Sequence, residues 1–221
     1  MTQRISCPDG AHRDQAVASA LAAVRRGDLV LIPTESVYAI AADAFSARGM
    51  EALREAKGYD PSTPVPVMVG RRATVAGIAA RISTEARALM EGFWPGELTV
   101  LLTAQPSLAW DQPSDHPLAV RMPLHPLALA LLAQTGPLAV TSANVPGLPA
   151  PIAVDDALEQ VGEAVALALD AGELAGAQTL PSTIVDARSA PPRIVRSGAL
   201  SAESIRRVCP SVLPEDADEG A

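Results

Sequence analysis

Apolar residues along this chain recur in two patterns, one typical of helices and the other of buried strands. Between residues 12 and 26 they recur at helical spacing, and Gly27 follows as a natural helix end. Residues 29–32 form a continuous apolar run, and a second run begins at 138 and leads into Thr141; both favour buried strands. By these criteria we expect strands at 29–32, 37–42, 65–69, 98–103, 118–122, 138–141, 165–169, 182–185 and 193–195, and helices at 12–26, 46–57, 72–81, 84–92, 125–134, 154–160 and 201–208.

The irregular alternation of these elements predicts an α/β fold with a mixed parallel and antiparallel sheet and flanking helices. Only a short connection joins 182–185 to 193–195, which favours an antiparallel pair if the two strands are neighbours. Pro66 lies inside an expected strand and indicates a sheet edge or an irregularity there. We expect one domain over 12–208, an N-terminal extension over 1–11 and an acidic, disordered tail over 209–221.

Composition narrows the classes of function. The 221 residues carry a formal net charge of −8, and only 3% are aromatic. A nucleic-acid binder usually presents a basic surface and stacking rings, so RNA binding is a weak expectation. Cys7 and Cys209 are far apart and are expected to be reduced thiols. No apolar run approaches the roughly 18 residues of a membrane span, and we expect no signal peptide and a cytoplasmic location.

Polar side chains gather beside several apolar runs. Thr34, Ser142, Asn144, Ser182 and Arg196 lie at strand ends, where α/β sheets bind ligands. Such hydroxyl and amide groups are more often simple turn or cap residues when each is taken alone.

Two cations stand out from this set. Arg121 sits inside an otherwise apolar strand, and a buried cation needs a partner, which could be a structural carboxylate or a ligand. Lys57 ends a helix before Gly58, where a lysine is usually a surface charge that complements the helix dipole.

Common catalytic motifs are missing from the sequence. The three histidines, His12, His116 and His125, have no metal-ligand spacing, no nucleophile–His–Asp arrangement is visible, and neither common nucleotide-binding glycine loop occurs. The set of Lys, Arg, hydroxyl and amide groups instead suits the binding of a carboxylate and a polyphosphate, with little covalent chemistry by side chains. No protein metal ligands are expected.

Seven short stretches, taken in order, carry a family resemblance. They are IPTESVY at 32–38, AKG at 56–58, FWPGELT at 93–99, VRMP at 120–123, TSAN at 141–144, PSTIVD at 181–186 and RSG at 196–198. Together they span most of residues 12–208, and the chain resembles the YrdC/TsaC family, the threonylcarbamoyl-AMP synthases.

The resemblance implies a twisted mixed sheet whose concave face binds ATP and L-threonine. Family enzymes carboxylate the threonine amine with bicarbonate, and the carbamate attacks the α-phosphate of ATP, which releases pyrophosphate. The product serves tRNA N6-threonylcarbamoyladenosine (t6A) modification, so downstream transfer proteins are implied partners, and Mg²⁺ would travel on the ATP phosphates. The matching residues are Thr34, Arg121 and Ser182 for threonine, Lys57, Ser142, Asn144 and Arg196 for ATP, and Lys57, Ser142 and Asn144 for catalysis.

Some positions depart from the family pattern. Tyr59 stands where the family usually has Arg, and a tyrosine supplies no permanent charge to a phosphate. Ala39 replaces a usual Gly, which matters if that position needs a positive φ or a close ligand approach. Ser36, Thr63 and Met68 differ as well. Two alternatives therefore remain: a paralogue that uses carbamoyl-adenylate chemistry on another acceptor, and a non-catalytic module that binds nucleotide or RNA.

Overall fold

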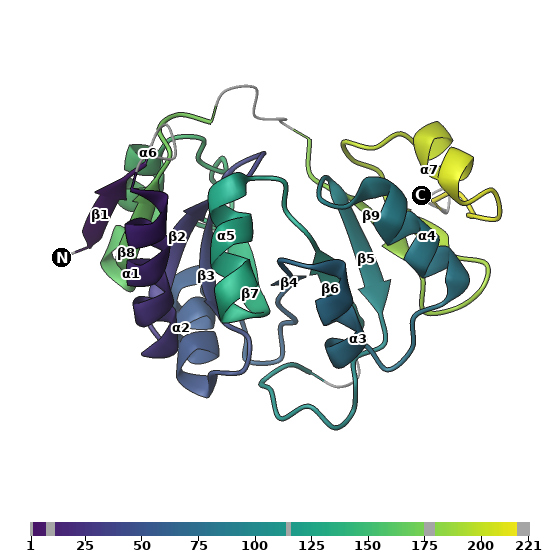
Figure 1. Cartoon of the computed structure of the whole chain (residues 1–221), viewed down its shortest axis with the longest axis horizontal. Coiled ribbons are helices and arrows are strands. Elements are labelled where there is room, and N and C mark those ends of the chain that lie inside the picture. Colours follow the sequence, from purple (N-terminus) through teal and green to yellow (C-terminus); the bar gives the residue numbers. More distant parts are fainter. Residues whose placement is uncertain (1, 8–11, 114–115, 175–179, 216–221) are drawn as a thin grey trace.

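The computed structural model describes residues 2–7, 12–113, 116–174 and 180–215 (Figure 1). These residues form one sheet of ten strands in the order β1-β8-β2-β3-β7-β4-β6-β5-β9-β10. The strands are β1 Gln3–Ser6, β2 Leu29–Pro33, β3 Tyr38–Asp43, β4 Val67–Met68, β5 Leu98–Leu102, β6 Leu118–Arg121, β7 Leu138–Ser142, β8 Val165–Asp170, β9 Thr183–Asp186 and β10 Arg193–Arg196. The helices are α1 Arg13–Arg25, α2 Ala47–Lys57, α3 Val75–Ile78, α4 Thr84–Phe93, α5 Pro126–Thr135, α6 Val154–Val161 and α7 Ala202–Val208, with short 3₁₀ turns at Arg72–Thr74 and Gly162–Ala164.

The sheet mixes both strand directions, as predicted. Strand β8 runs parallel to β1 and to β2, whereas β3 pairs antiparallel with both β2 and β7. At the other side, β5 pairs antiparallel with β6 and parallel with β9. Strands β9 and β10 form the antiparallel pair expected from their short connection. The predicted single mixed α/β sheet with flanking helices is confirmed.

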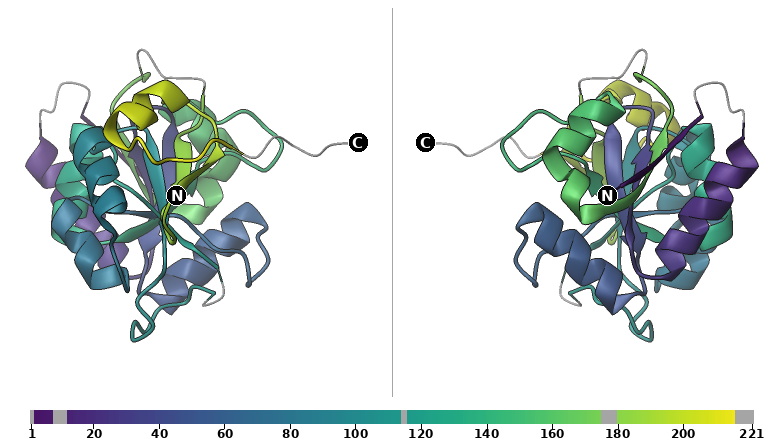
Figure 2. Two further views of the ribbon diagram at one scale, coloured as in Figure 1. Left: turned by 90° about the vertical axis from the view of Figure 1, so that its right-hand side faces the viewer. Right: turned by 90° about the vertical axis from the view of Figure 1, so that its left-hand side faces the viewer.

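Helices cover both faces of the sheet because its central strands are apolar on both sides (Figure 2). In β2, Val30 and Ile32 pack with α1 and α5 in one buried cluster. Leu29 and Leu31 face the opposite cluster, which includes side chains of α2. This alternation is the two-residue period of a strand, and it explains why the run 29–32 has no polar position.

Two local predictions need correction. The expected helix over 72–81 is a 3₁₀ turn followed by the short α3, because Ala79 leaves the helix and bridges to Ala104. The expected strand at 65–69 is only the two-residue β4, and it lies between β7 and β6, so the sheet-edge reading is wrong. Pro66 has no N–H to donate, but its carbonyl accepts from Val140 N at 2.9 Å, which explains the irregularity.

Described residues on both sides of the predicted domain, 12–208, pack with the rest of the fold. Strand β1 pairs with β8 and extends the sheet, although it lies in the segment expected to be an extension. Beyond α7, Val212 is buried and Leu213 bridges to Arg193, so these residues of the expected disordered tail are ordered. Residues 216–221 of that tail, and residues 1 and 8–11 of the extension, lie outside the described residues.

Candidate active site

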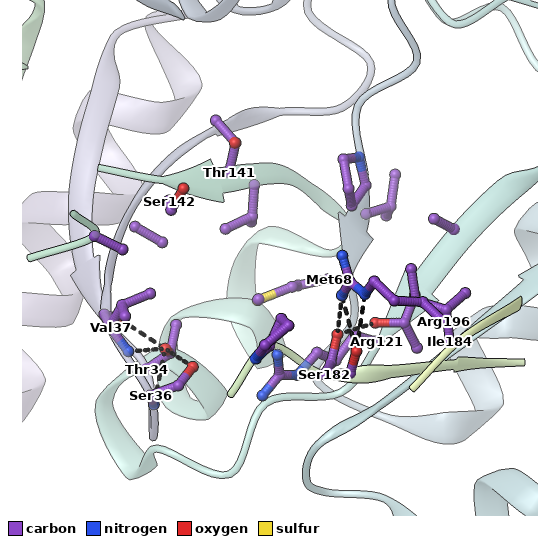
Figure 3. Close-up of a pocket in the computed structure, with 18 of the residues that line it drawn as sticks. Thr34, Ser36, Val37, Met68, Arg121, Thr141, Ser142, Ser182, Ile184 and Arg196 are labelled. Carbon is purple, nitrogen blue, oxygen red and sulfur yellow. Dashed lines mark hydrogen bonds between the residues drawn. The ribbon is translucent and has the colours of Figure 1, made fainter. Parts of the chain in front are cut away.

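A cavity of about 360 Å³ lies over the middle of the sheet and collects polar residues from widely separated segments (Figure 3). Its walls include Thr34 after β2, Arg121 of β6, Ser142 of β7, Ser182 before β9 and Arg196 of β10. Five of the seven predicted site residues therefore share one cavity wall. The other two, Lys57 and Asn144, are not among the lining residues but contact Ser142.

Thr34 stabilises the turn between β2 and β3. Its hydroxyl accepts from Val37 N at 3.1 Å and donates to Val37 O at 2.6 Å. The Ser36 hydroxyl lies 3.3 Å from Thr34 Oγ1. The turn is thus closed by a side chain, as is common for threonine beside a strand, and it presents two hydroxyl groups to the cavity.

Arg121 is held by two carboxylates. Its Nη2 donates to Glu35 Oε1 and to Glu97 Oε2, each at 2.6 Å, and its Nε donates to Gly96 O at 3.0 Å. The side chain is only 11% exposed. The guanidinium lies between Ser182 and the Thr34–Ser36 turn (Figure 3). The structural partner that the sequence left open is therefore present, and ligand contact by Arg121 stays a prediction.

Glu97 is a site residue that the sequence reasoning missed. Burial raises its pKa, Arg121 lowers it in part, and the charge of Glu35 raises it again, so the net direction is upward. The only sequence signal was an acidic residue in each of two stretches, 32–38 and 93–99, together with a single arginine inside an apolar strand.

Ser182 and Arg196 form the opposite part of the wall. The Ser182 and Thr99 hydroxyls lie 2.8 Å apart, and Arg196 Nη2 donates to Ser182 O at 2.8 Å and to Ser182 Oγ at 3.1 Å. Burial and the charge of Arg121 lower the pKa of Arg196. Gly198 lets the segment after β10 lie close to the backbone of residues 181 and 182, because a Cβ at position 198 would lie 2.2 Å from Pro181 O.

Lys57 is buried at the end of α2, so the reading of it as a surface charge is wrong. Ser46 begins the helix by accepting from Gly49 N, and Gly58 ends it with a φ of 60°. Lys57 Nζ donates to Ser142 O at 2.8 Å and to Asn144 O, and it lies 3.3 Å from Asn144 Oδ1. Burial lowers the pKa of Lys57. The ammonium thus holds the chain that follows β7.

Asn144 and Tyr59 are neighbours of Ser142 and Lys57 at this side of the cavity. Asn144 Oδ1 accepts from Ser142 Oγ at 2.5 Å, and its Nδ2 donates to Leu148 O at 2.8 Å. The Tyr59 hydroxyl lies 3.3 Å from Thr141 Oγ1, and its ring centroid lies 6.0 Å from Lys57 Nζ. The phenol therefore supplies a hydroxyl and a ring face, but no charge, beside the lysine.

The other departures from the family pattern have simple places in the fold. Ala39 lies inside β3, and His12 is the one non-glycine residue with positive φ among those the structure describes, so Ala39 needs no special backbone conformation. Its methyl group and Met68 line the cavity. His125 caps α5 by accepting from Leu127 N at 3.3 Å, at the start of the helix expected over 125–134.

Sequence comparison identifies the family. The family model Sua5/YciO/YrdC, which carries the description "Telomere recombination", matches residues 22–198. The chain belongs to the Sua5/YciO/YrdC family.

Individual relatives extend this result. A putative threonylcarbamoyl-AMP synthase of Mycobacterium tuberculosis is 43% identical over 209 residues, which cover 94% of this chain and 95% of the relative. The crystal structure of Pyrococcus abyssi Sua5 complexed with L-threonine is 29% identical with a TM-score of 0.89, and the alignment covers 100% of this chain but 64% of Sua5. Escherichia coli YciO has the same fold, with a TM-score of 0.79 at 22% identity, and the alignment covers 93% of this chain and 100% of YciO.

Two negative findings apply to the described part of the chain. No group of three or more His, Cys, Asp and Glu side chains is arranged there to hold a metal ion. No helix in the same residues is long and apolar enough to cross a bilayer.

Proposed function

We propose that this protein is an L-threonylcarbamoyl-AMP synthase, which makes threonylcarbamoyl-AMP and pyrophosphate from L-threonine, bicarbonate and ATP for t6A modification of tRNA. The observation that carries the proposal is the shared cavity. Thr34, Arg121, Ser142, Ser182 and Arg196 meet there in a chain that aligns over its full length with the threonine-bound Sua5. The mycobacterial relatives named as putative threonylcarbamoyl-AMP synthases support the same assignment.

Threonine binds, in this proposal, at the Arg121 end of the cavity. The guanidinium pairs with the amino-acid carboxylate, and the hydroxyl groups of Thr34 and Ser182 orient the substrate. The neutral amine, formed when the ammonium group loses a proton to solvent, adds to the carbon of bicarbonate, and water leaves as the carbamate forms. A carbamate oxygen then forms a bond to the α-phosphorus of ATP while the bond to pyrophosphate breaks. This reaction class is nucleotidyl transfer.

The phosphates bind, in the same proposal, on the side of the cavity lined by Ser142, which Lys57 and Asn144 contact, and they extend toward Arg196 on the opposite part of the wall. Stabilisation of developing phosphate charge and orientation of the carbamate are the catalytic contributions of Lys57, Ser142 and Asn144. The cavity wall offers hydroxyl and cationic groups rather than a carboxylate cage, and these fit Mg²⁺ that enters already bound to ATP. The metal would neutralise phosphate charge.

Pyrophosphate release from ATP by the purified full chain tests the proposal. We expect release that requires both bicarbonate and L-threonine, with a product of the mass of threonylcarbamoyl-AMP. Release with a different amino acid but not with threonine would contradict the substrate and indicate a paralogue. The absence of any turnover, together with salt-sensitive RNA binding, would instead indicate a binding module.

A further inference from the structure

The buried carboxylates around Arg121 outnumber the cation that binds them. Glu35 and Glu97 both accept from the same nitrogen, Nη2. Their side chains are 12% and 13% exposed, so neither charge is well hydrated. Two like charges that share one donor in a poorly hydrated site oppose each other, and a proton on either one relieves this repulsion.

Each glutamate also has an oxygen with nothing to bind. Glu35 Oε2 and Glu97 Oε1 are buried and lack a hydrogen-bond partner in the described structure. A buried, unpaired carboxylate oxygen carries a desolvation penalty, whereas a protonated carboxyl group carries much less charge to desolvate. The burial and the unpartnered oxygens of these two carboxylates therefore favour protonation of one of them even without a ligand.

The surrounding charged groups do not remove the imbalance. Arg196 on β10 binds Ser182 and neither glutamate. Burial lowers the pKa of His125 at the start of α5, the charge of Glu35 raises it in part, and Arg13 on α1 lowers it again, so the net direction is downward and the imidazole is neutral near pH 7. Arg121 remains the one cation that the two carboxylates contact in the described structure.

We propose that Glu97 takes up a proton from solvent when the carboxylate of the amino-acid substrate binds Arg121, so that substrate binding is coupled to protonation. The inference rests on the proposed function, because that function brings a third carboxylate to the same guanidinium. The proton adds to Glu97 Oε1, the unpartnered oxygen, while Oε2 continues to accept from Arg121 Nη2.

The direction of the Glu97 pKa supports this choice of residue. Burial already places that pKa above its ordinary value, and a third negative charge nearby raises it further. Between about pH 5 and 7 free threonine keeps a constant charge, so the pH dependence reports the protein. Threonine affinity should rise as the pH falls, by up to about tenfold per pH unit for one coupled proton.

Calorimetric titration of the full chain with L-threonine, in buffers that differ in ionisation enthalpy, counts the protons directly. We expect net uptake that approaches one proton per threonine. The variant E97Q resembles the protonated form, so its uptake should vanish and its affinity should become independent of pH, at a strength equal to or above that of the unmodified protein. The control E51Q makes the same charge change on the exposed face of α2 and should leave the uptake unchanged.

The possible results separate this inference from the proposed function. Threonine binding without proton uptake, or uptake that persists in E97Q, overturns the inference but leaves the synthase assignment intact. If E97Q binds threonine more weakly and remains pH-dependent, Glu97 only positions Arg121. No threonine binding together with no threonine-dependent pyrophosphate release overturns both. If E97Q fails to fold by circular dichroism, the proton count of the unmodified protein and a reduced count in E35Q still decide the matter.

Discussion

Two cations at opposite ends of the site, Arg121 in the cavity wall and Lys57 in contact with the wall residue Ser142, are held in different ways. At one end, Arg121 is bound by two carboxylates, Glu35 and Glu97. At the other end, Lys57 donates to the backbone carbonyls of Ser142 and Asn144, which are neutral. Both cations are buried, so the difference lies in charge compensation and not in exposure.

This difference assigns different ligands to the two ends. An arginine whose charge is already more than offset by two carboxylates can orient a single carboxylate in a planar geometry, but it adds little net attraction for a highly charged anion. A lysine held by neutral oxygens keeps its full positive charge, because no carboxylate offsets it. The proposed placement of threonine at Arg121 and of the phosphates at Lys57 follows this division.

Removal of Arg121 should have the largest effect, on stability. In Arg121→Met, two buried carboxylates lose their cation, and we expect a loss of about 3–5 kcal/mol in the free energy of unfolding at pH 7. Urea denaturation measures it. The pKa of Glu97 rises further above 4.5 without Arg121, so the folded state binds more protons than the unfolded state. The lost stability should therefore return as the pH falls toward that value.

A triple variant provides the matched control for this prediction. Addition of Glu35→Gln and Glu97→Gln to Arg121→Met removes the uncompensated charges and should restore most of the lost stability at pH 7. If Arg121→Met loses less than about 1 kcal/mol, or if the triple variant is no more stable than the single one, the carboxylates do not depend on Arg121 in the way described here.

Removal of Lys57 should affect ATP and spare threonine. In Lys57→Met we expect kcat/KM for ATP in pyrophosphate release to fall about ten- to a hundredfold, the range for one lost charge-assisted contact. The dissociation constant for threonine should stay within about twofold, since Lys57 contacts the Ser142–Asn144 segment and not Arg121. The control Arg48→Met removes an exposed cation from the same helix. Equal losses for both substrates would contradict the division of the cavity.

The buried position of Lys57 also predicts a pH dependence. Burial lowers its pKa below the ordinary 10.5, so its positive charge is lost at a lower pH than that of a free lysine. ATP affinity should fall as the pH rises through this lowered pKa, and Lys57→Met should lack that alkaline decline. Binding titrations of ATP at increasing pH measure both curves. An unchanged decline in the variant would assign it to another group.

Loss of the Ser182 hydroxyl should have a smaller effect, at the other end. Ser182→Ala removes the contacts to Thr99 and to Arg196 Nη2, while the backbone carbonyl of residue 182 still accepts from Arg196. We expect threonine binding to weaken about fivefold, which corresponds to about 1 kcal/mol for one hydrogen-bonding group. Calorimetry measures the change, and Ser189→Ala, at an exposed turn, is the control. A larger change in ATP affinity than in threonine affinity would contradict the assignment.

Local chemistry made part of this structure predictable from sequence. The run 29–32 is buried on both faces, so its lack of polar positions alone predicts a strand. The helix at 46–57 has a start signal and a stop signal in the sequence, because Ser46 caps it and Gly58 ends it. The burial of Arg121 was predictable because it is the single charged residue inside an apolar run.

Features that depend on distant partners were not predictable in the same way. Strand β1 is mostly exposed and pairs through its backbone with β8, so it has no apolar alternation to detect. The burial of Lys57 depends on carbonyl groups 85 and 87 residues away, and no local pattern reports them. Nothing in the sequence singles out Glu97 among the acidic residues, because its role depends on Arg121, which strand β6 places beside it.

Substitution of Tyr59 should have the smallest effect. Two variants distinguish whether its ring or its hydroxyl contributes to ATP binding near Lys57. The hydroxyl contact to Thr141 is long, at 3.3 Å, so Tyr59→Phe should change KM for ATP by less than about twofold. The ring face lies 6.0 Å from Lys57 Nζ, at the limit of a cation–π contact. Tyr59→Leu should therefore weaken ATP binding by about two- to fivefold, the effect of about 0.5–1 kcal/mol. If Tyr59→Phe weakens ATP binding as much as Tyr59→Leu does, the hydroxyl and not the ring contributes to ATP binding. Tyr59 then acts through Thr141 rather than through Lys57.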